Sequence, residues 1–236
     1  EYLSDADEAS RAEITFGIAT DSADIEGAVI ATDDTVIDRA DLDRVLDQFR
    51  GPVSQIPPAH SAIRIDGKRA YELARAGQEV EMPSRDVTIH DLTLISFESN
   101  VAVVDIACSK GTYIRSLARD LGAALGTVAY LSNLVRTRSG PFDQADAWTI
   151  AELRELDPVA SWPELAMHPD EALIDWPAIV LSDAEETDWR FGRAITAPGE
   201  PGMRARMYNT IGEWVGLAEY NPDANNWQPT RVIGNQ

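Results

Sequence analysis

The sequence is poor in the residues that build metal centres and disulfides. It contains one cysteine, Cys108, and three histidines among 236 residues. A single cysteine cannot form a disulfide within the chain, which is typical of a reducing compartment. His60, His90 and His168 are far apart and show none of the spacings of a zinc site. We therefore expect no bound metal, a buried structural thiol at Cys108, and histidines that are loop or surface residues.

Long hydrophobic runs are also missing. No apolar stretch approaches the ~20 residues that a helix needs to cross a bilayer, and no basic segment followed by an apolar one opens the chain. The chain is 44% hydrophobic and 25% charged, which excludes a disordered, collagen-like or coiled-coil protein. Its length fits one large domain, or a medium domain with a small one. We expect a soluble, cytoplasmic monomer without membrane contact.

Basic residues are scarce. Twenty Lys and Arg face forty Asp and Glu, a net charge of -20, which argues against a polyanionic partner because phosphate contacts dominate nucleic-acid affinity. The acidity is uneven: residues 1–50 carry a net of -10 and residues 151–236 a net of -9, whereas residues 108–140 carry +4. The basic residues of this island are Lys110, Arg115, Arg119, Arg136 and Arg138. The island is either a binding surface or a solvated helix face.

Strand patterns open the chain. Ile14, Phe16 and Ile18 alternate with polar residues, which predicts a strand with one buried face. The turn residues 24–27 before the apolar run 28–31 predict a hairpin. Two further β segments are predicted over 87–97 and 101–108, separated by a polar turn.

Helical spacing follows the first hairpin. From Asp41 the apolar residues recur at helical intervals, which predicts an amphipathic helix with Gly51 as its C-cap. An extended loop is predicted through Pro52, Pro57 and Pro58, and a short helix over 71–76 that Gly77 ends.

The junction at residues 108–112 joins a strand to a helix through Gly111. The helix is marked by a buried stripe, and Arg115 and Arg119 lie off that stripe. The stripe consists of Ile114, Leu117, Ala118 and Leu121. Free N–H groups at a helix start can bind a phosphate or carboxylate, but an ordinary strand-to-helix turn has the same spacing. Both readings stay open.

The last part of the chain has a different character. A helix and linker over 151–170 predict a domain boundary near His168. Beyond it, Ser182 and Glu185 form a capping-box pattern and Gly192 can close the helix. Short β-prone runs follow over 204–208, 213–220 and 230–233. We predict an α+β protein with one domain over 1–168 and a small β-rich module over 169–236.

Common catalytic motifs are missing. The sequence has no Walker loop, dinucleotide fingerprint or nucleophile elbow. The segment from Thr20 to Asp24 is either a polar loop at the rim of a site or an Asx turn. The residues by themselves do not predict the chemistry.

Six strings, in order, carry a resemblance. They are FGIATDSADIEG (16–27), FRG (49–51), QIPP (55–58), SAIR (61–64), GKRAYELAR (67–75) and CSKGTYIRSLA (108–118). Together they resemble the bacterial TruB-type tRNA pseudouridine synthases over residues 1 to about 150. The strings DWPA (175–178) and PTRVI (229–233) are similar to the family's C-terminal RNA-binding, PUA-like module.

The resemblance implies a fold and a reaction. The fold would be the pseudouridine synthase fold, a mixed, largely antiparallel sheet with flanking helices, followed by a small β-rich module. The enzyme would be an isomerase that uses no cofactor and acts on the T-loop uridine in the T-arm of tRNA. In the family an Asp carboxylate attacks the uridine, the glycosidic bond breaks, and the rotated base rejoins through C5. The target nucleotide must be flipped out of the folded loop to react.

The resemblance also assigns residues. Tyr113 matches the tyrosine that lines the pocket, and Leu134 the leucine that contacts the flipped nucleotide. Arg115 matches the arginine that pairs with the catalytic Asp, and Asp24 an acidic residue near the site. Lys110, Arg136 and Lys68 are candidates for RNA backbone contacts.

Two departures from the family pattern affect function. The nucleophile motif, Gly-x-x-Asp-Pro-x-Ala-x-Gly, occurs nowhere in these residues, and we expect it upstream of Glu1, so the chain as given is expected to be inactive. Ser10 stands where the family has a tyrosine that stacks on the base. His60 and Arg64 replace Tyr and Lys, which are milder changes.

Three functions follow from this pattern. The first is the larger part of a tRNA pseudouridine synthase. The second, which Ser10 favours, is a catalytically dead protein that binds the tRNA T-arm or assists its folding. The third is an acidic interaction domain, which absence of tRNA binding at low salt would favour.

Overall fold

The computed structural model describes residues 6–65, 67–76, 78, 82–157, 161–162 and 165–234. Contacts divide the chain into two compact units, Glu1–Ala147 and Trp148–Gln236, and each is described by itself. The division falls before the boundary predicted near His168. His168 already belongs with the second unit, because its ring makes an edge contact with Trp214 at 5.7 Å.

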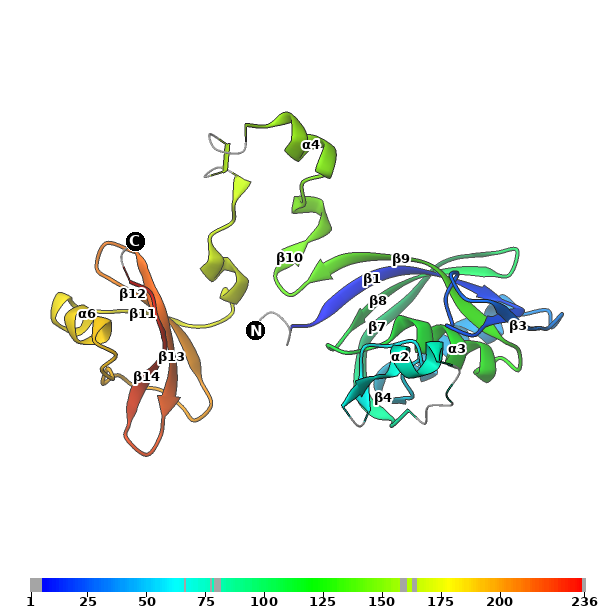
Figure 1. The fold of residues 1–236 in the computed structure, drawn as a ribbon, viewed down its shortest axis with the longest axis horizontal. Helices are drawn as coiled ribbons and strands as arrows, with labels where there is room; N and C mark the ends of the chain where they lie inside the picture. Colours follow the sequence, from blue (N-terminus) through cyan, green and yellow to red (C-terminus); the bar gives the residue numbers. More distant parts are fainter. Residues whose placement is uncertain are drawn as a thin grey trace. The chain divides into compact units, whose positions relative to one another are not determined.

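The first unit is built on one antiparallel sheet with strand order β10-β9-β1-β8-β7-β4. In Figure 1 the strands β9, β1, β8 and β7 lie side by side, with α3 beside them. The strands are β1 (Glu8–Phe16), β4 (Gly51–Gln55), β7 (Arg85–Glu98), β8 (Val101–Cys108), β9 (Ala129–Ser139) and β10 (Phe142–Asp143). The predicted strands over 87–97 and 101–108 are confirmed. The strand predicted through Ile14, Phe16 and Ile18 is correct only to Phe16: β1 begins earlier than predicted, and Ile18 lies in the separate strand β2.

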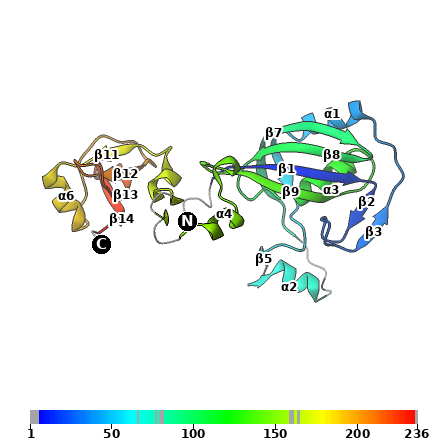
Figure 2. The same ribbon diagram turned by 90° about the horizontal axis from the view of Figure 1, so that it is seen from above.

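The core of this unit lies between the sheet and two helices, α1 (Arg39–Gln48) and α3 (Ile114–Ala124). In β8 every second residue is buried, as period-two alternation requires. The predicted stripe of α3 is confirmed, because Leu117, Ala118 and Leu121 are fully buried. Figure 2 shows α1 and α3 along the strands of the sheet.

A two-stranded hairpin, β2 (Ile18–Thr20) with β3 (Val29–Thr32), follows β1 and confirms the predicted hairpin. The chain turns between β1 and β2 at Gly17, whose φ is +89°. A Cβ there would lie 2.8 Å from the Asp33 carbonyl oxygen, so the position requires glycine. The turn at Gly17 therefore fixes where the chain leaves β1 and enters the hairpin.

Two predictions around Gly51 are wrong. The helix α1 ends at its C-cap Phe49, and Gly51 instead opens β4. Pro52, predicted in a loop, lies in β4, where it is opposite Thr88. Proline is tolerated because β4 is at the edge of the sheet, where a strand pairs on one side only and can lack an N–H.

Between β4 and β7 the chain forms a small hairpin and a short helix. The hairpin is β5 (Arg64–Ile65) with β6 (Lys68–Arg69), and α2 spans Ala70–Arg75. The helix confirms the one predicted over 71–76. Gly77, predicted to end it, lies outside the described residues. The 3-10 helix η2 (Gln144–Asp146) closes the unit.

The second unit contains a four-stranded sheet with order β11-β12-β13-β14. Its elements are α4 (Ile150–Glu155), η3 (Pro169–Leu173), β11 (Ala178–Val180), α6 (Asp183–Arg190), β12 (Arg204–Tyr208), β13 (Trp214–Asn221) and β14 (Asn226–Val232). The capping box predicted at Ser182 is confirmed. Trp189 of α6 is fully buried, and its indole N–H donates to the Val215 carbonyl at 2.8 Å. The predicted β-rich module is therefore present.

Candidate functional site

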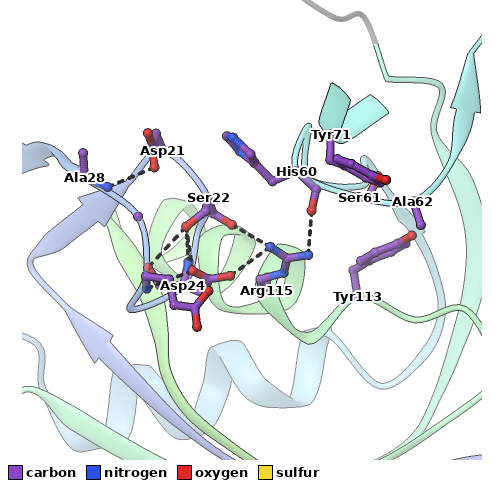
Figure 3. A pocket seen from close by; sticks show the side chains of 12 residues that line it. Asp21, Ser22, Asp24, Ala28, His60, Ser61, Ala62, Tyr71, Tyr113 and Arg115 are labelled. Carbon is purple, nitrogen blue, oxygen red and sulfur yellow. Dashed lines mark hydrogen bonds and ion pairs between the residues drawn. The ribbon is translucent and has the colours of Figure 1, made fainter. Parts of the chain in front are cut away.

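One cavity of the first unit has a volume of about 760 Å³. Three segments that are far apart in sequence line it: the turn between β2 and β3, the stretch from His60 to Tyr71, and the start of α3. Its lining residues are Asp21, Ser22, Asp24, Glu26, Gly27, Ala28, His60, Ser61, Ala62, Tyr71, Tyr113 and Arg115. Figure 3 shows Tyr71 and Tyr113 on one side and Asp21 and Asp24 on the other, with Arg115 between them.

The turn that carries Asp24 is held against β9. The Leu131 N–H donates to the Ala23 carbonyl at 3.0 Å, and the hydroxyl of Thr20 donates to the Asp24 carbonyl at 2.7 Å. An Asx turn forms as well, because Oδ1 of Asp24 accepts the Glu26 N–H at 3.0 Å. The two readings of this segment therefore both hold: it is an Asx turn, and it lies at the rim of the cavity.

The junction before α3 presents Tyr113 and Arg115 to the cavity. Gly111 has a φ of +73°, and the Thr112 hydroxyl donates to the Ser109 carbonyl at 2.7 Å, which turns the chain into the helix. Tyr113 is the N-cap residue, and its side chain caps nothing. Its ring therefore remains available to line the cavity.

Arg115 joins the three segments. Its Nη1 donates to Asp24 Oδ2 at 2.9 Å and to the Ser22 carbonyl at 3.3 Å. Its Nη2 donates to the His60 carbonyl at 2.9 Å. Figure 3 shows these bonds radiating from one guanidinium. The side chains of Arg115 and Asp24 are 24% and 23% exposed, so solvent screens this ion pair less than one on the open surface.

Opposing effects set the charge state of Asp24. Burial raises the pKa of its carboxyl group. Hydrogen bonds from the Ser22 hydroxyl and the Glu26 N–H, together with the charge of Arg115, lower the pKa by more than burial raises it. The net pKa lies below the ordinary value of Asp. Asp24 is therefore ionised at neutral pH, and the arginine beside it is held by a fixed negative charge.

Two polar atoms at the cavity have no hydrogen-bond partner among the described residues, Nδ1 of His60 and Oγ of Ser61. Ser61 is only 5% exposed. Buried polar atoms usually have partners, so both atoms are exceptions in the wall of the cavity. Ser61 and Tyr71 were not predicted as site residues. Both lie within the strings that resemble the family, and that was the signal that could have identified them.

The structure brings together some predicted site residues and separates others. Asp24, Tyr113 and Arg115 line the cavity. Ser10 and Leu134 lie instead on the neighbouring strands β1 and β9, where Leu134 is opposite Ala12. Ser10 is buried, and its hydroxyl also has no partner among the described residues.

The predicted RNA-contacting residues lie at three different places. Lys68 is exposed on β6, and Lys110 is exposed in the turn before α3. Arg136 is on β9 opposite Ser10 and forms an ion pair with Glu8.

Neither a metal cluster nor a membrane span is found in the described part of the chain. Within residues 6–65, 67–76, 78, 82–157, 161–162 and 165–234, no three His, Cys, Asp or Glu side chains are grouped to hold a metal ion. Over the same ranges, no helix has the length and apolar character that crossing a membrane requires. Cys108 is buried as predicted. Burial also raises the pKa of its thiol.

The arrangement suits a flat, polar ligand. Tyr71 and Tyr113 offer aromatic surface, and nucleobases stack on such rings. The partly exposed side chains of Asp24 and Arg115 offer hydrogen bonds. The cavity volume lies within the usual range of small-ligand sites.

Solved structures define the class of fold. The chain superposes with a TM-score of 0.69 on a chain of an H/ACA RNP bound to a substrate RNA containing 2'-deoxyuridine, covering 99% of this chain and 68% of that one at 17% identity. It superposes with a TM-score of 0.68 on a chain of a Cbf5-Nop10-Gar1 complex, covering 99% and 67% at 19% identity. The predicted α+β fold is thus confirmed as the fold that these chains share.

Sequence comparisons identify the family. Residues 1–114 match the TruB family pseudouridylate synthase N-terminal domain, 115–165 the tRNA pseudouridylate synthase B C-terminal domain, and 177–233 the pseudouridine synthase II TruB C-terminal model. The chain is 40% identical to tRNA pseudouridine synthase B of Pseudomonas putida strain F1, over 99% of this chain and 77% of that protein. It is 38% identical to the Pseudomonas aeruginosa enzyme, over 99% and 78%. The chain belongs to the TruB family of pseudouridine synthases.

Proposed function

We propose that this protein is a cytoplasmic, monomeric isomerase that converts a uridine in the T-arm of tRNA to pseudouridine without a cofactor. One observation carries the proposal: Asp24, Tyr113 and Arg115, which match family positions by sequence, line a single cavity. The relatives from Pseudomonas bear the name tRNA pseudouridine synthase B, which supports tRNA as the substrate.

The cavity would receive the flipped nucleotide. A uridine inside a folded T-loop hides its reacting atoms, so the base must leave the stack before chemistry can occur. Tyr113 would contact the base, and the partly exposed side chains of Asp24 and Arg115 would bond its polar edge. Stacking on an aromatic ring is worth about 1–3 kcal/mol per base. This gain offsets part of the cost of unstacking.

The nucleophilic Asp of the family would come from a segment that precedes Glu1. Arg115 is suited to hold it. The described residues engage the guanidinium through three contacts, to Ser22, Asp24 and His60, and a guanidinium has more N–H donors than these contacts use. A carboxylate bound there would stay ionised, as nucleophilic attack requires.

Release of tritium tests the function. Isomerisation replaces the C5–H bond of uracil by a bond from C5 to the ribose, so tritium at C5 passes to water. We expect release from tRNA tritiated at uridine C5 by the protein that includes the segment before Glu1, and none by residues 1–236 alone. Absence of release by the longer protein would refute the proposal.

Arg115→Lys makes the test specific for the site. Lysine keeps the charge but cannot bridge Asp24 and His60 as the guanidinium does, and we expect the rate to fall at least about 100-fold. The matched control is Arg11→Lys. The Arg11 guanidinium donates two hydrogen bonds to the Asp105 carboxylate, at 2.7 and 2.8 Å, on an exposed face. Arg11→Lys is expected to leave the rate unchanged.

A second function is favoured by Ser10 alone. Serine cannot stack on a base as the family tyrosine does, which fits a protein that binds the T-arm without turnover. That protein would bind T-arm RNA with steep salt dependence and release no tritium even with the nucleophile segment present. Tight binding together with tritium release would exclude it.

A further inference from the structure

Gln55, the last residue of β4, has a fully buried carboxamide. Both of its polar atoms bond to the backbone of one residue, Tyr113. Oε1 accepts the Tyr113 N–H at 3.0 Å, and Nε2 donates to the Tyr113 carbonyl at 3.4 Å. The two residues are 58 positions apart in sequence, so this bond links an edge strand to the start of α3.

The bond falls at a sensitive point of the helix. Tyr113 is the N-cap of α3, and its carbonyl also accepts the Leu117 N–H at 3.0 Å, the first bond of the helix. The N–H groups at a helix start have no partner within the helix. Gln55 therefore satisfies the amide of the N-cap residue and restrains its carbonyl at the same time.

Neighbouring contacts hold the rest of this segment to α3 but do not bond to Tyr113. The Ser116 hydroxyl and Nη2 of Arg119 both donate to the Ile56 carbonyl, at 2.8 and 2.9 Å. Gln55 differs from these contacts because its partner is the residue whose ring lines the cavity. A shift of the Tyr113 backbone would move that ring.

We propose that Gln55 is a positioning residue for pseudouridine formation, acting through Tyr113. It holds the Tyr113 backbone so that the ring meets the flipped base in the reactive orientation. This inference rests on the proposed function. Because misplacement of about 1 Å can cost 100-fold in rate, loss of the bond is expected to slow turnover while leaving tRNA affinity within about twofold, since backbone phosphate contacts dominate affinity.

Amide exchange tests the bond without turnover. The substitution is Gln55→Met, which keeps the length of the side chain and removes both polar atoms. We expect the Tyr113 amide to exchange at least tenfold faster than in the unsubstituted protein, while the Leu117 amide, which bonds within α3, stays protected. Unchanged exchange at Tyr113 would refute the bond and with it the proposal.

Single-turnover tritium release tests the role. With saturating protein that includes the segment before Glu1, we expect Gln55→Met to lower the rate 10- to 100-fold. The control is Thr127→Val, which removes a buried hydroxyl's 2.8 Å bond to Asp33 outside the cavity. Each rate is divided by the concentration of folded protein in the sample. If the two substitutions lowered the rate equally, Gln55 would have only a structural role and the proposal would be refuted.

A double-mutant cycle with Tyr113→Ala separates positioning from general damage. If Gln55 acts through the Tyr113 ring, adding Gln55→Met to Tyr113→Ala should lower the rate by less than twofold. Full additivity would overturn the proposal. If Gln55→Met does not fold, Gln55→Leu, which is also neutral and removes both polar atoms, replaces it with the same expected effects.

The two proposals fail in different ways. Absence of tritium release by the unsubstituted protein would refute the proposed function and the catalytic role of Gln55 together. The exchange rate of the Tyr113 amide would still decide whether Gln55 holds Tyr113. Release of tritium that is insensitive to Gln55→Met would refute only the role of Gln55.

Discussion

Nη1 of Arg115 lies 2.9 Å from Oδ2 of Asp24, although the two residues are 91 positions apart in sequence. The pair ties α3 to the turn between β2 and β3. Because Nη2 of the same guanidinium holds the His60 carbonyl, one side chain joins all three walls of the cavity. The position of Arg115, and with it the arrangement of the three walls, therefore depends on the charge of Asp24.

Asp24→Asn should destabilise the protein in a pH-dependent way. The depressed pKa of Asp24 means that its ionised form stabilises the fold, a contribution that is present at neutral pH and lost as pH falls through the folded-state pKa. We expect a loss of about 2 kcal/mol in the free energy of unfolding at pH 7. Below the ordinary Asp pKa of about 3.9 the loss should shrink. Urea unfolding at pH 7 and pH 3 measures both, and an equal difference at the two pH values would contradict the assignment.

Ser10→Ala should stabilise the protein. The Ser10 hydroxyl is buried without a partner among the described residues, and an unsatisfied buried polar group costs about 1–3 kcal/mol. We expect the free energy of unfolding to rise by about 1 kcal/mol, measured by urea denaturation.

Ser116→Ala is the matched control for that change. Ser116 is also fully buried, but its hydroxyl donates to the Ile56 carbonyl at 2.8 Å. Removing it leaves that carbonyl with one donor fewer, so stability should fall by about 1 kcal/mol. Shifts of the same sign for the two serines would contradict the hydrogen-bond assignment.

The Cys108 thiol should be unreactive in the folded protein. It is 1% exposed, and burial is the main cause that raises its pKa, so little thiolate forms at pH 8. We expect an aromatic disulfide reagent to react at least about 100-fold more slowly than with free cysteine. In denaturant the rate should match that of the free amino acid. Rapid labelling of the native protein would show that the end of β8 opens.

Local patterns in the chain were sufficient for most of the secondary structure. Alternation predicted β8 and helical spacing predicted α3. One face of each element is buried, and its buried residues recur with period two in the strand and at helical intervals in the helix. The capping box at Ser182 was also readable, since its two partners are three residues apart. Gly51 and Pro52 were misplaced because the edge position of β4, where a proline is tolerated, depends on the neighbouring strand β7.

Family resemblance extended this reading to Asp24, Tyr113 and Arg115, which do share a cavity. The bonds of Gln55 and the burial of Ser61 were not readable, although both residues lie in matched strings. A glutamine between a strand and two prolines carries no local sign of its partner.

The amino-acid order therefore determined most of the elements and the family, whose signals are local strings and periods. Tertiary structure alone decided the ion pair between Asp24 and Arg115 and the hold of Gln55 on Tyr113. These contacts join residues 91 and 58 positions apart, and such pairings form only when packing of the sheet against α3 brings the distant segments together.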